Sequence, residues 1–187
     1  MNGRPILLLF TGTGGSGRKS VARRVGEALQ LTAVASYTTR EPRKKETNTD
    51  FYRFIHESDF EKAEQDGEFI QTAKINRYRY GIKRADLEAA LSSEYGAYLV
   101  LNKEGTELFK RMFGAQAVRI FIYVSKQSIL ERLTARGTPF EVLERYMAQY
   151  PDEVSYRKSC EIVVENLELE ATAAKVLEAV RASLLVT

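Results

Sequence analysis

Short, mainly apolar runs alternate along the chain with segments of helical periodicity. The first covers residues 6–10 without interruption, and residues 97–101, 118–124 and 162–164 repeat the signal. Apolar runs of this length are typical of strands that are buried on both faces of a parallel sheet. Because a plausible helix follows each run, the pattern predicts a doubly wound α/β fold with a parallel core.

Apolar residues spaced three and four apart indicate which faces of these helices are buried. For the helix after the first run, the expected buried face comprises Val21, Val25, Ala28 and Leu29. For the last helix, within residues 171–185, it comprises Ala174, Leu177, Val180 and Leu184.

Residues 32–82 interrupt this alternation. The segment is rich in Tyr, Thr and Arg, and residues 50–55 have the pattern of a half-buried strand. We interpret it as a lobe with some antiparallel sheet, inserted into a single domain that spans residues 1–187. The core then comprises about residues 1–32 and 83–187, and the lobe about 33–82.

The composition points to neither a nucleic acid nor a membrane partner. Hydrophobic residues make up 44% of the chain, charged residues 28%, and the net charge is +3, which is ordinary for a soluble globular protein. No segment reaches the ~20 apolar residues of a membrane helix, and the first apolar run is too short for a signal peptide. We therefore expect a cytoplasmic protein.

Single residues with reactive side chains have structural interpretations. Cys160 is the only cysteine and precedes an apolar strand, so an internal disulfide is excluded and a structural thiol is expected. His56 is the only histidine and is expected on the surface. No cluster has the spacing of metal ligands. Residues 76–84 interleave cations with tyrosines, as RNA-binding patches do, but the low net charge disfavours RNA.

A glycine-rich segment after the first apolar run nearly matches a phosphate-binding loop. In the pattern G-x-x-x-x-G-K-[ST], backbone N–H groups cradle phosphates, the lysine reaches them and the hydroxyl holds Mg²⁺. Gly12 and Gly17 have this spacing, but Arg18 stands at the lysine position and Lys19 at the hydroxyl position. A register slipped by one residue would give these roles to Lys19 and Ser20, with Arg18 where a glycine normally keeps the loop tight. The first register is favoured.

Four segments in order resemble the guanylate kinases over about residues 4–182. After the glycine loop, residues 36–43 read S-Y-T-T-R-E-P-R, and residues 78–81 read Y-R-Y-G after G-E-F-I at 67–70. Arg132 and Arg136 begin an arginine-bearing segment. The resemblance implies a P-loop three-layer fold: a parallel central sheet, an inserted mixed-sheet lobe that binds the nucleoside monophosphate, and a helical lid at about residues 132–157.

The resemblance also implies which residues bind nucleotides. ATP, with Mg²⁺, would lie on the glycine loop, and the phosphate of GMP would lie on the inserted lobe, in line for transfer. On the loop, the implied residues are Gly12, Gly14, Gly15, Gly17, Lys19 and Ser20. At the acceptor phosphate they are Ser36, Arg40, Arg43, Tyr52, Tyr80 and Gly81.

The positions that read guanine in the family are altered. Gln71 stands where the family has a glutamate, Ile82 where it has Ser or Thr, and Asn102 where it has a base-reading aspartate. Val100 replaces a further aspartate near the metal. Guanine presents N1–H and an amino group as donors, which a carboxylate accepts. Hydrogen bonds to charged groups contribute about 1.5–3 kcal/mol each, so guanine selectivity should be lost.

The candidate catalytic residues are arginines that would face the transferred phosphoryl group: Arg18, Arg132, Arg136 and Arg145. Residues 139–141 are one residue short of the family pattern, so Tyr146 takes the place of a family arginine. Asn166 corresponds to an asparagine that contacts adenine. An alternative is that the lid arginines only solvate two helices.

These losses favour a protein that binds a phosphate-bearing ligand, a GMP-like molecule or a phosphopeptide, with phosphotransfer weak or lost. This is the pattern of a pseudoenzyme, without cofactors. The alternative is an active kinase of GMP, or of a different phosphorylated acceptor, that uses ATP and Mg²⁺.

Overall fold

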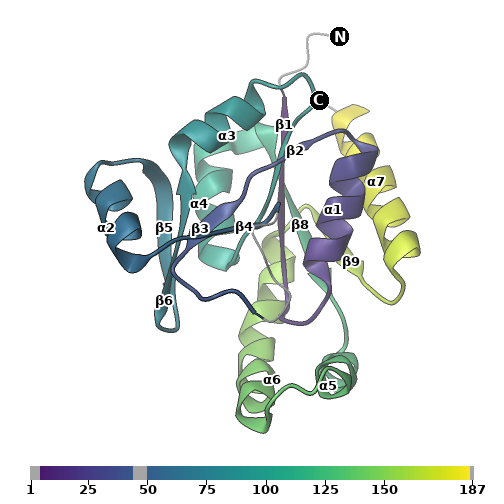
Figure 1. Cartoon of the computed structure of the whole chain (residues 1–187). Helices are drawn as coiled ribbons and strands as arrows, with labels where there is room; N and C mark the ends of the chain where they lie inside the picture. The colour runs from purple at the N-terminus through teal and green to yellow at the C-terminus, as the bar shows by residue number, and fades with distance from the viewer. Residues whose placement is uncertain (1–4, 44–49, 186–187) are drawn as a thin grey trace.

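A five-stranded parallel sheet forms the centre of the computed structural model, which describes residues 5–43 and 50–185 (Figure 1). Its strands lie in the order β2-β7-β1-β8-β9. Their bounds are Thr32–Ala33 (β2), Gly96–Val100 (β7), Ile6–Gly12 (β1), Ala117–Tyr123 (β8) and Ile162–Glu165 (β9). The four predicted apolar runs are therefore confirmed as strands.

Helices cover both faces of this sheet. Helices α1 (Arg18–Ala28) and α7 (Leu169–Leu185) lie on one face, and α3 (Arg84–Leu91) and α4 (Lys103–Phe113) on the other (Figure 1). Successive β1 side chains point to opposite faces: Leu8 and Phe10 pack in the core under α1 and α7, and the neighbouring leucines pack in the core under α3 and α4. The predicted three-layer α/β fold is confirmed.

A second, mixed sheet lies beside the first. Its order is β4-β3-β6-β5, with bounds Tyr52–Phe54 (β4), Ser36–Thr38 (β3), Tyr78–Lys83 (β6) and Phe69–Ile75 (β5). Strands β3 and β4 are parallel, whereas the β3–β6 and β5–β6 pairs are antiparallel. Helix α2 (Glu57–Gln65) covers this sheet through Phe60, whose ring stacks on Phe69 at 4.5 Å.

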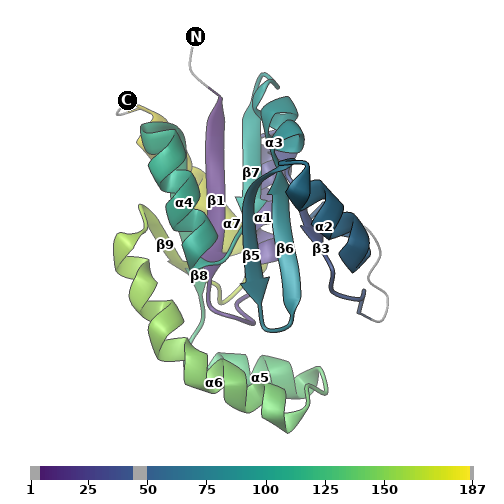
Figure 2. The same ribbon diagram turned by 90° about the vertical axis from the view of Figure 1, so that its left-hand side faces the viewer.

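Two helices lie beyond the carboxyl ends of the central strands: α5 (Lys126–Ala135) and α6 (Phe140–Ser155) (Figure 2). Ile129 and Leu133 of α5 pack with Tyr146 and Tyr150 of α6 in a small separate core. We call α5 and α6 the lid. Short 3₁₀ turns at Gly114–Gln116 (η1) and Tyr156–Ser159 (η2) complete the described elements.

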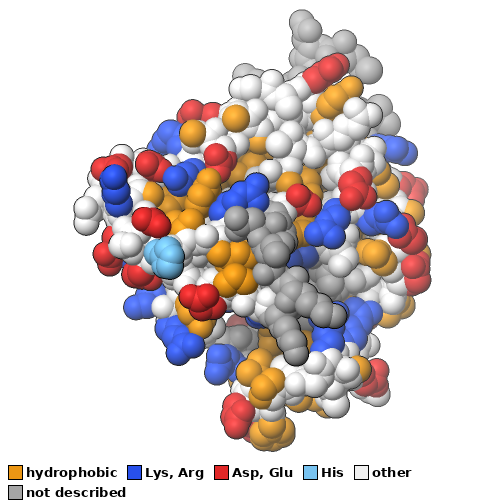
Figure 3. All heavy atoms as spheres, viewed as in Figure 1, with side chains coloured by type: hydrophobic (Ala, Val, Ile, Leu, Met, Phe, Trp, Pro, Cys, Tyr) orange, Lys and Arg blue, Asp and Glu red, His pale blue; other side chains and the backbone are white. Residues whose placement is uncertain are grey.

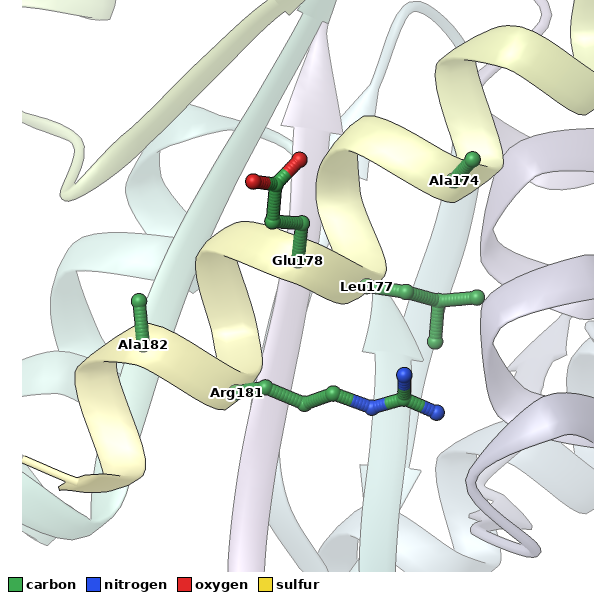
Figure 4. Close-up of a pocket in the computed structure, with 5 residues that line it drawn as sticks. All are labelled: Ala174, Leu177, Glu178, Arg181 and Ala182. Atoms are coloured by element: carbon green, nitrogen blue, oxygen red, sulfur yellow. The ribbon is translucent and has the colours of Figure 1, made fainter.

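The predicted helix faces need correction. In α7 the buried face is Ala173, Val176 and Val180, whereas Ala174 is exposed. Figure 4 shows Ala174, Leu177, Glu178, Arg181 and Ala182 lining a shallow surface pocket on this helix. The side chain of Leu184 lies outside the described residues. In α1, Val21 and Val25 are buried as predicted, but Ala28 is exposed.

The surface carries both signs of charge. Acidic and basic side chains are interspersed over the face in Figure 3, where the exposed His56 is the pale-blue residue. Burial raises the pKa of the Cys160 thiol to about 12, which fits the predicted structural role. Among the described helices, none has the length and apolar character needed to cross a membrane.

Candidate functional site

The glycine loop, residues 12–17, connects the end of β1 to the start of α1. Gly12 has a φ of 142°, and a Cβ atom there would lie 1.8 Å from the carbonyl oxygen of Ile122. Gly17 has a φ of 82° and immediately precedes Arg18, the first residue of α1. Only glycine suits these two positions, so their spacing is set by the backbone geometry of the loop.

The turn after β9 supports the glycine loop. Asn166 donates from Nδ2 to the carbonyl oxygen of Ser16 at 2.6 Å, and from its backbone N–H to Tyr123 at 2.7 Å. Arg132, one of the predicted catalytic arginines, donates from Nη2 to the Asn166 carbonyl oxygen at 2.7 Å. Arg132 and Asn166 therefore hold the β9–α7 turn against the loop.

The two cations after Gly17 point in different directions. The Arg18 guanidinium turns back and donates to the carbonyl oxygen of Gly12 within the loop. Lys19 extends toward the inserted lobe, and its Nζ lies 3.8 Å from the centroid of the Tyr52 ring. Ser20 is exposed in the first turn of α1. Arg18 thus occupies the position that the lysine holds in the common pattern.

The loop contains polar groups suited to an anion. The hydroxyls of Thr13 and Ser16 are buried and have no hydrogen-bond partner among the described residues. The backbone N–H of Gly14 is occupied by a carboxylate, because it donates to Oε2 of Glu153 in α6 at 2.8 Å. Buried hydroxyls and loop N–H groups of this kind are satisfied by phosphate oxygens.

Tyr52 of β4 and Tyr80 of β6 gather with Arg40, which follows β3, on the side of the inserted lobe. We call these three residues the phosphate clasp, after the role that the family resemblance implies for them. The Tyr52 and Tyr80 rings are 6.2 Å apart, and the guanidinium carbon of Arg40 lies 5.2 Å from the Tyr52 ring centroid. Burial raises the pKa of the Tyr80 hydroxyl, while its hydrogen bonds with Thr38 and Arg40 act in the opposite direction. A guanidinium beside two phenols is a suitable donor set for a phosphate.

The other predicted acceptor residues lie around the clasp. Ser36 is buried at the start of β3, and its backbone N–H donates to the Phe51 carbonyl oxygen at 2.9 Å. A Cβ atom on Gly81 would lie 2.7 Å from the Phe69 ring. Arg43 is exposed immediately before residues 44–49, which lie outside the described residues.

The three altered base-reading positions differ in what they offer a ligand. Gln71 and Ile82 are directly paired across β5 and β6, and Ile82 is buried in the core. Asn102 is the N-cap of α4, and its Oδ1 accepts from the backbone N–H of Gly105 at 3.0 Å. The cap uses one lone pair of this oxygen, and the Nδ2 group is a donor that a carboxylate at this position would lack.

Of the lid arginines, Arg145 approaches the inserted lobe. It lines an open pocket with Asn76, Arg77 and Tyr78 at the tip of the β5–β6 hairpin. Arg136 is exposed at the C-terminal end of α5.

The residues present do not fit a protein-held Mg²⁺ ion. The ammonium of Lys19 stands where the pattern has a metal-binding hydroxyl, and it contacts the Tyr52 ring. Val100 packs against the apolar core where the resemblance implies a carboxylate. In the part of the chain that the structure describes, no group of three or more His, Cys, Asp or Glu side chains could hold a metal.

Two lid residues touch the loop, and sequence reasoning missed one of them, Glu153. Besides Glu153, the ring of Tyr146 covers Gly14, where a Cβ atom would lie 2.1 Å from ring atom Cε1. Glu153 lies in a helix with many charged residues, so its local sequence carries no signal for this contact. The one-residue gap at 139–141 did single out Tyr146.

Comparisons with known proteins point to one family. The family model described as Guanylate kinase matches residues 2–183. A guanylate kinase of Nitrosomonas europaea is 32% identical, over 97% of this chain and 91% of its own length. One from Deinococcus radiodurans is 31% identical, over 94% of this chain and 74% of its own length. The crystal structure of guanylate kinase from Anaplasma phagocytophilum superposes with a TM-score of 0.75 and 26% identity, covering 95% of this chain and 85% of that one.

Proposed function

Because the chain belongs to the guanylate kinase family, we propose that it transfers the γ-phosphoryl group of ATP to a nucleoside monophosphate. The observation that carries the proposal is the juxtaposition of the glycine loop and the phosphate clasp, which Lys19 spans by reaching Tyr52. A donor phosphate on the loop and an acceptor phosphate on the clasp would then lie side by side. Positioning of this kind, with neutralisation of charge, is the main requirement of phosphoryl transfer.

In the proposed reaction, an oxygen of the acceptor phosphate attacks the γ-phosphorus of ATP. The bond from that phosphorus to the β–γ bridging oxygen breaks, so ADP and a nucleoside diphosphate are the products. The loop N–H groups and the hydroxyls of Thr13 and Ser16 would bind the ATP phosphates, and Arg18 would neutralise charge beside them. Arg40, Tyr52 and Tyr80 would hold the acceptor phosphate, and Arg145 would approach from the lid.

We propose that the protein distinguishes guanine only weakly from the other bases of an acceptor nucleotide. The Ile82 side chain offers no hydrogen bond, and the single side-chain oxygen of Asn102 already accepts one hydrogen bond in the α4 cap. The remaining amide donor of Asn102 suits a base that presents an acceptor, whereas guanine presents N1–H and an amino group at the edge read by a carboxylate. GMP is therefore one acceptor among several.

A coupled assay for ADP tests the proposal. The full chain is incubated with ATP, Mg²⁺ and, separately, GMP, AMP, CMP, UMP and their deoxy forms. Turnover above the rate without acceptor is expected with GMP and with at least one other monophosphate. Turnover with GMP alone would contradict the relaxed base selectivity, and no turnover with any monophosphate would contradict the kinase proposal.

A second candidate is phosphate binding without transfer. It is favoured by the contact of Glu153 with the Gly14 N–H, because a carboxylate there competes with the phosphates of ATP. Under this alternative, GMP or a phosphopeptide would raise the melting temperature while ADP formation stayed at background. We favour the kinase because the loop retains its phosphate-binding backbone and its buried hydroxyls.

A further inference from the structure

Lys19 links the glycine loop to the inserted lobe. It is the second residue of α1 and is half-buried, and its Nζ lies 3.8 Å from the Tyr52 ring centroid and 5.8 Å from that of Phe51. Arg18, the preceding residue, bonds within the loop. The two adjacent cations therefore lie on different sides, with Arg18 in the loop and Lys19 toward the inserted lobe.

The ammonium of Lys19 shares its aromatic neighbour with the phosphate clasp. The same Tyr52 ring faces the guanidinium carbon of Arg40 at 5.2 Å, and Arg40 also bonds to the hydroxyl of Tyr80. Two positive charges are thus brought to one ring, with a phenolic donor beside them. Such a group suits a doubly charged anion better than it suits a neutral ligand.

Helix stability does not account for a lysine at this position. The first turn of α1 contains no acidic residue, and the helix dipole disfavours cations at its N-terminal end. The ring contact attracts an ammonium, but a cation that serves only to pack on Tyr52 would not need to stand at the metal-ligand position of the loop. A charge placed there is better explained by a ligand between loop and clasp.

We propose that Lys19 binds the phosphate of the acceptor, a phosphate monoester dianion, together with Arg40. Its ammonium supplies positive charge between loop and clasp, at the position where the common loop pattern has a metal-binding hydroxyl. The identity of the acceptor as a nucleoside monophosphate rests on the proposed function. The binding role of Lys19 toward a phosphate monoester does not require turnover.

Calorimetric titration of single variants tests this role. Lys19→Met removes the charge and keeps the apolar length on the ring, and Lys19→Arg keeps the charge. The matched control is Arg23→Met, one turn further along α1, where the guanidinium faces Phe51 at 5.3 Å and pairs with Asp50 at 3.6 Å. The probes are GMP, inorganic phosphate, guanosine and ATP, each without a second substrate, and melting curves check that every variant is folded.

Loss of the Lys19 charge should weaken binding of GMP and of phosphate about tenfold or more. Lys19→Arg and Arg23→Met should stay within about threefold of the wild type, and ATP binding of Lys19→Met should change less than GMP binding. The proposal would be overturned if Lys19→Met bound GMP as tightly as the wild type does. It would also be overturned if the variant lost affinity only for ATP, or lost affinity for guanosine as much as for GMP. A wild-type protein that bound neither GMP nor phosphate would overturn it as well.

The outcomes separate this inference from the proposed function. Weakened phosphate binding in Lys19→Met without any turnover in the wild type supports the role of Lys19 and contradicts the kinase. Turnover with unchanged GMP affinity in Lys19→Met supports the kinase and contradicts the role of Lys19.

Discussion

The backbone N–H of Gly14 donates to the carboxylate of Glu153 at 2.8 Å, across a sequence separation of 139 residues. A carboxylate on a loop N–H occupies the kind of position that a phosphate oxygen takes when nucleotide binds. A phosphate oxygen of ATP at this N–H would compete with the carboxylate for the same donor, so we expect Glu153 to leave the loop when ATP binds. Because Glu153 lies in α6, this competition connects ATP binding to the position of the lid.

Replacing Glu153 with Gln should therefore tighten ATP binding. The variant removes the negative charge from the loop, although the amide oxygen can still accept from Gly14. Because hydrogen bonds to charged groups contribute about 1.5–3 kcal/mol and only part of this is released, Kd for ATP should fall roughly three- to tenfold. Calorimetric titration with ATP measures the change.

The control for Glu153→Gln is Asp152→Asn, an exposed neighbouring carboxylate in the same helix. It alters the net charge by the same amount and should leave Kd within about twofold, because exposed charges are screened by salt. Equal gains in both variants, or weaker ATP binding in Glu153→Gln, would show that Glu153 does not compete with the donor.

Restoring a carboxylate at position 102 should restore preference for guanine. An aspartate caps a helix as well as an asparagine does, and its second oxygen remains available to accept from the base. One such bond should raise the ratio of kcat/KM for GMP over AMP about tenfold or more. Steady-state kinetics of Asn102→Asp with both acceptors measures this ratio.

Asn102→Ser separates base reading from helix capping. Serine also caps but offers no second acceptor, so the GMP-to-AMP ratio should stay near that of the wild type. If Asn102→Ser and Asn102→Asp shift the ratio alike, the cap and not the carboxylate determines selectivity.

The glycine loop could be predicted from sequence because it depends on local patterns, whereas the clasp residues were implied by the family resemblance. The apolar run of β1 and the Gly12–Gly17 spacing follow from burial and backbone conformation, and Arg40 stands within a contiguous motif. The Glu153 contact could not be found in this way, because it depends on how α6 packs against α5 and approaches the loop. From sequence, the charge of Glu153 predicts only that it lies on the exposed face of a helix.

The buried face of α7 is a second feature that hydrophobic periodicity did not predict correctly. Apolar residues occupy several neighbouring stripes of this helix, so a period of 3.6 residues fits more than one face. Packing against α1 and the sheet selects Val176 and Val180, and leaves Ala174 exposed. Similarly, β9 was predicted as buried, but it is the edge strand, and Val163 is 41% exposed.

The fold should lose stability in acid through Glu161. Its carboxylate accepts from the Arg119 side chain at 2.9 Å and pairs with Lys110 at 3.1 Å. Burial alone would raise the pKa of Glu161, but these donors outweigh burial and lower it from 4.5 to about 2. Since the folded pKa lies below the unfolded one, this stabilisation is present above pH 4.5 and is lost as the pH falls toward 2.

Melting temperatures between pH 6 and pH 2.5 check this expectation, with Glu161→Gln compared with the wild type. The difference between the two should be largest at pH 6 and shrink in acid. The exposed Glu94 provides the control, because Glu94→Gln should follow the wild type at every pH. A constant difference between Glu161→Gln and the wild type would mean that the contribution of Glu161 is not ionic.

The ring of Tyr146 covers the glycine loop where the family resemblance implies an arginine. An arginine at this position of α6 would bring a guanidinium to the phosphates on the loop, where negative charge is shared during transfer. Arginines that act in this way raise kcat by about 10³–10⁵ in some phosphoryl-transfer enzymes, so a gain in kcat of about tenfold or more is expected for Tyr146→Arg. Steady-state kinetics with ATP and GMP measures the change.

Tyr146 also packs with Ile129 and Leu133, so Tyr146→Arg should melt at a lower temperature than the wild type. Tyr146→Met fills the space without a charge and should lose stability without gaining turnover. If both variants have the same kcat, the absence of a cation above Gly14 does not limit the reaction.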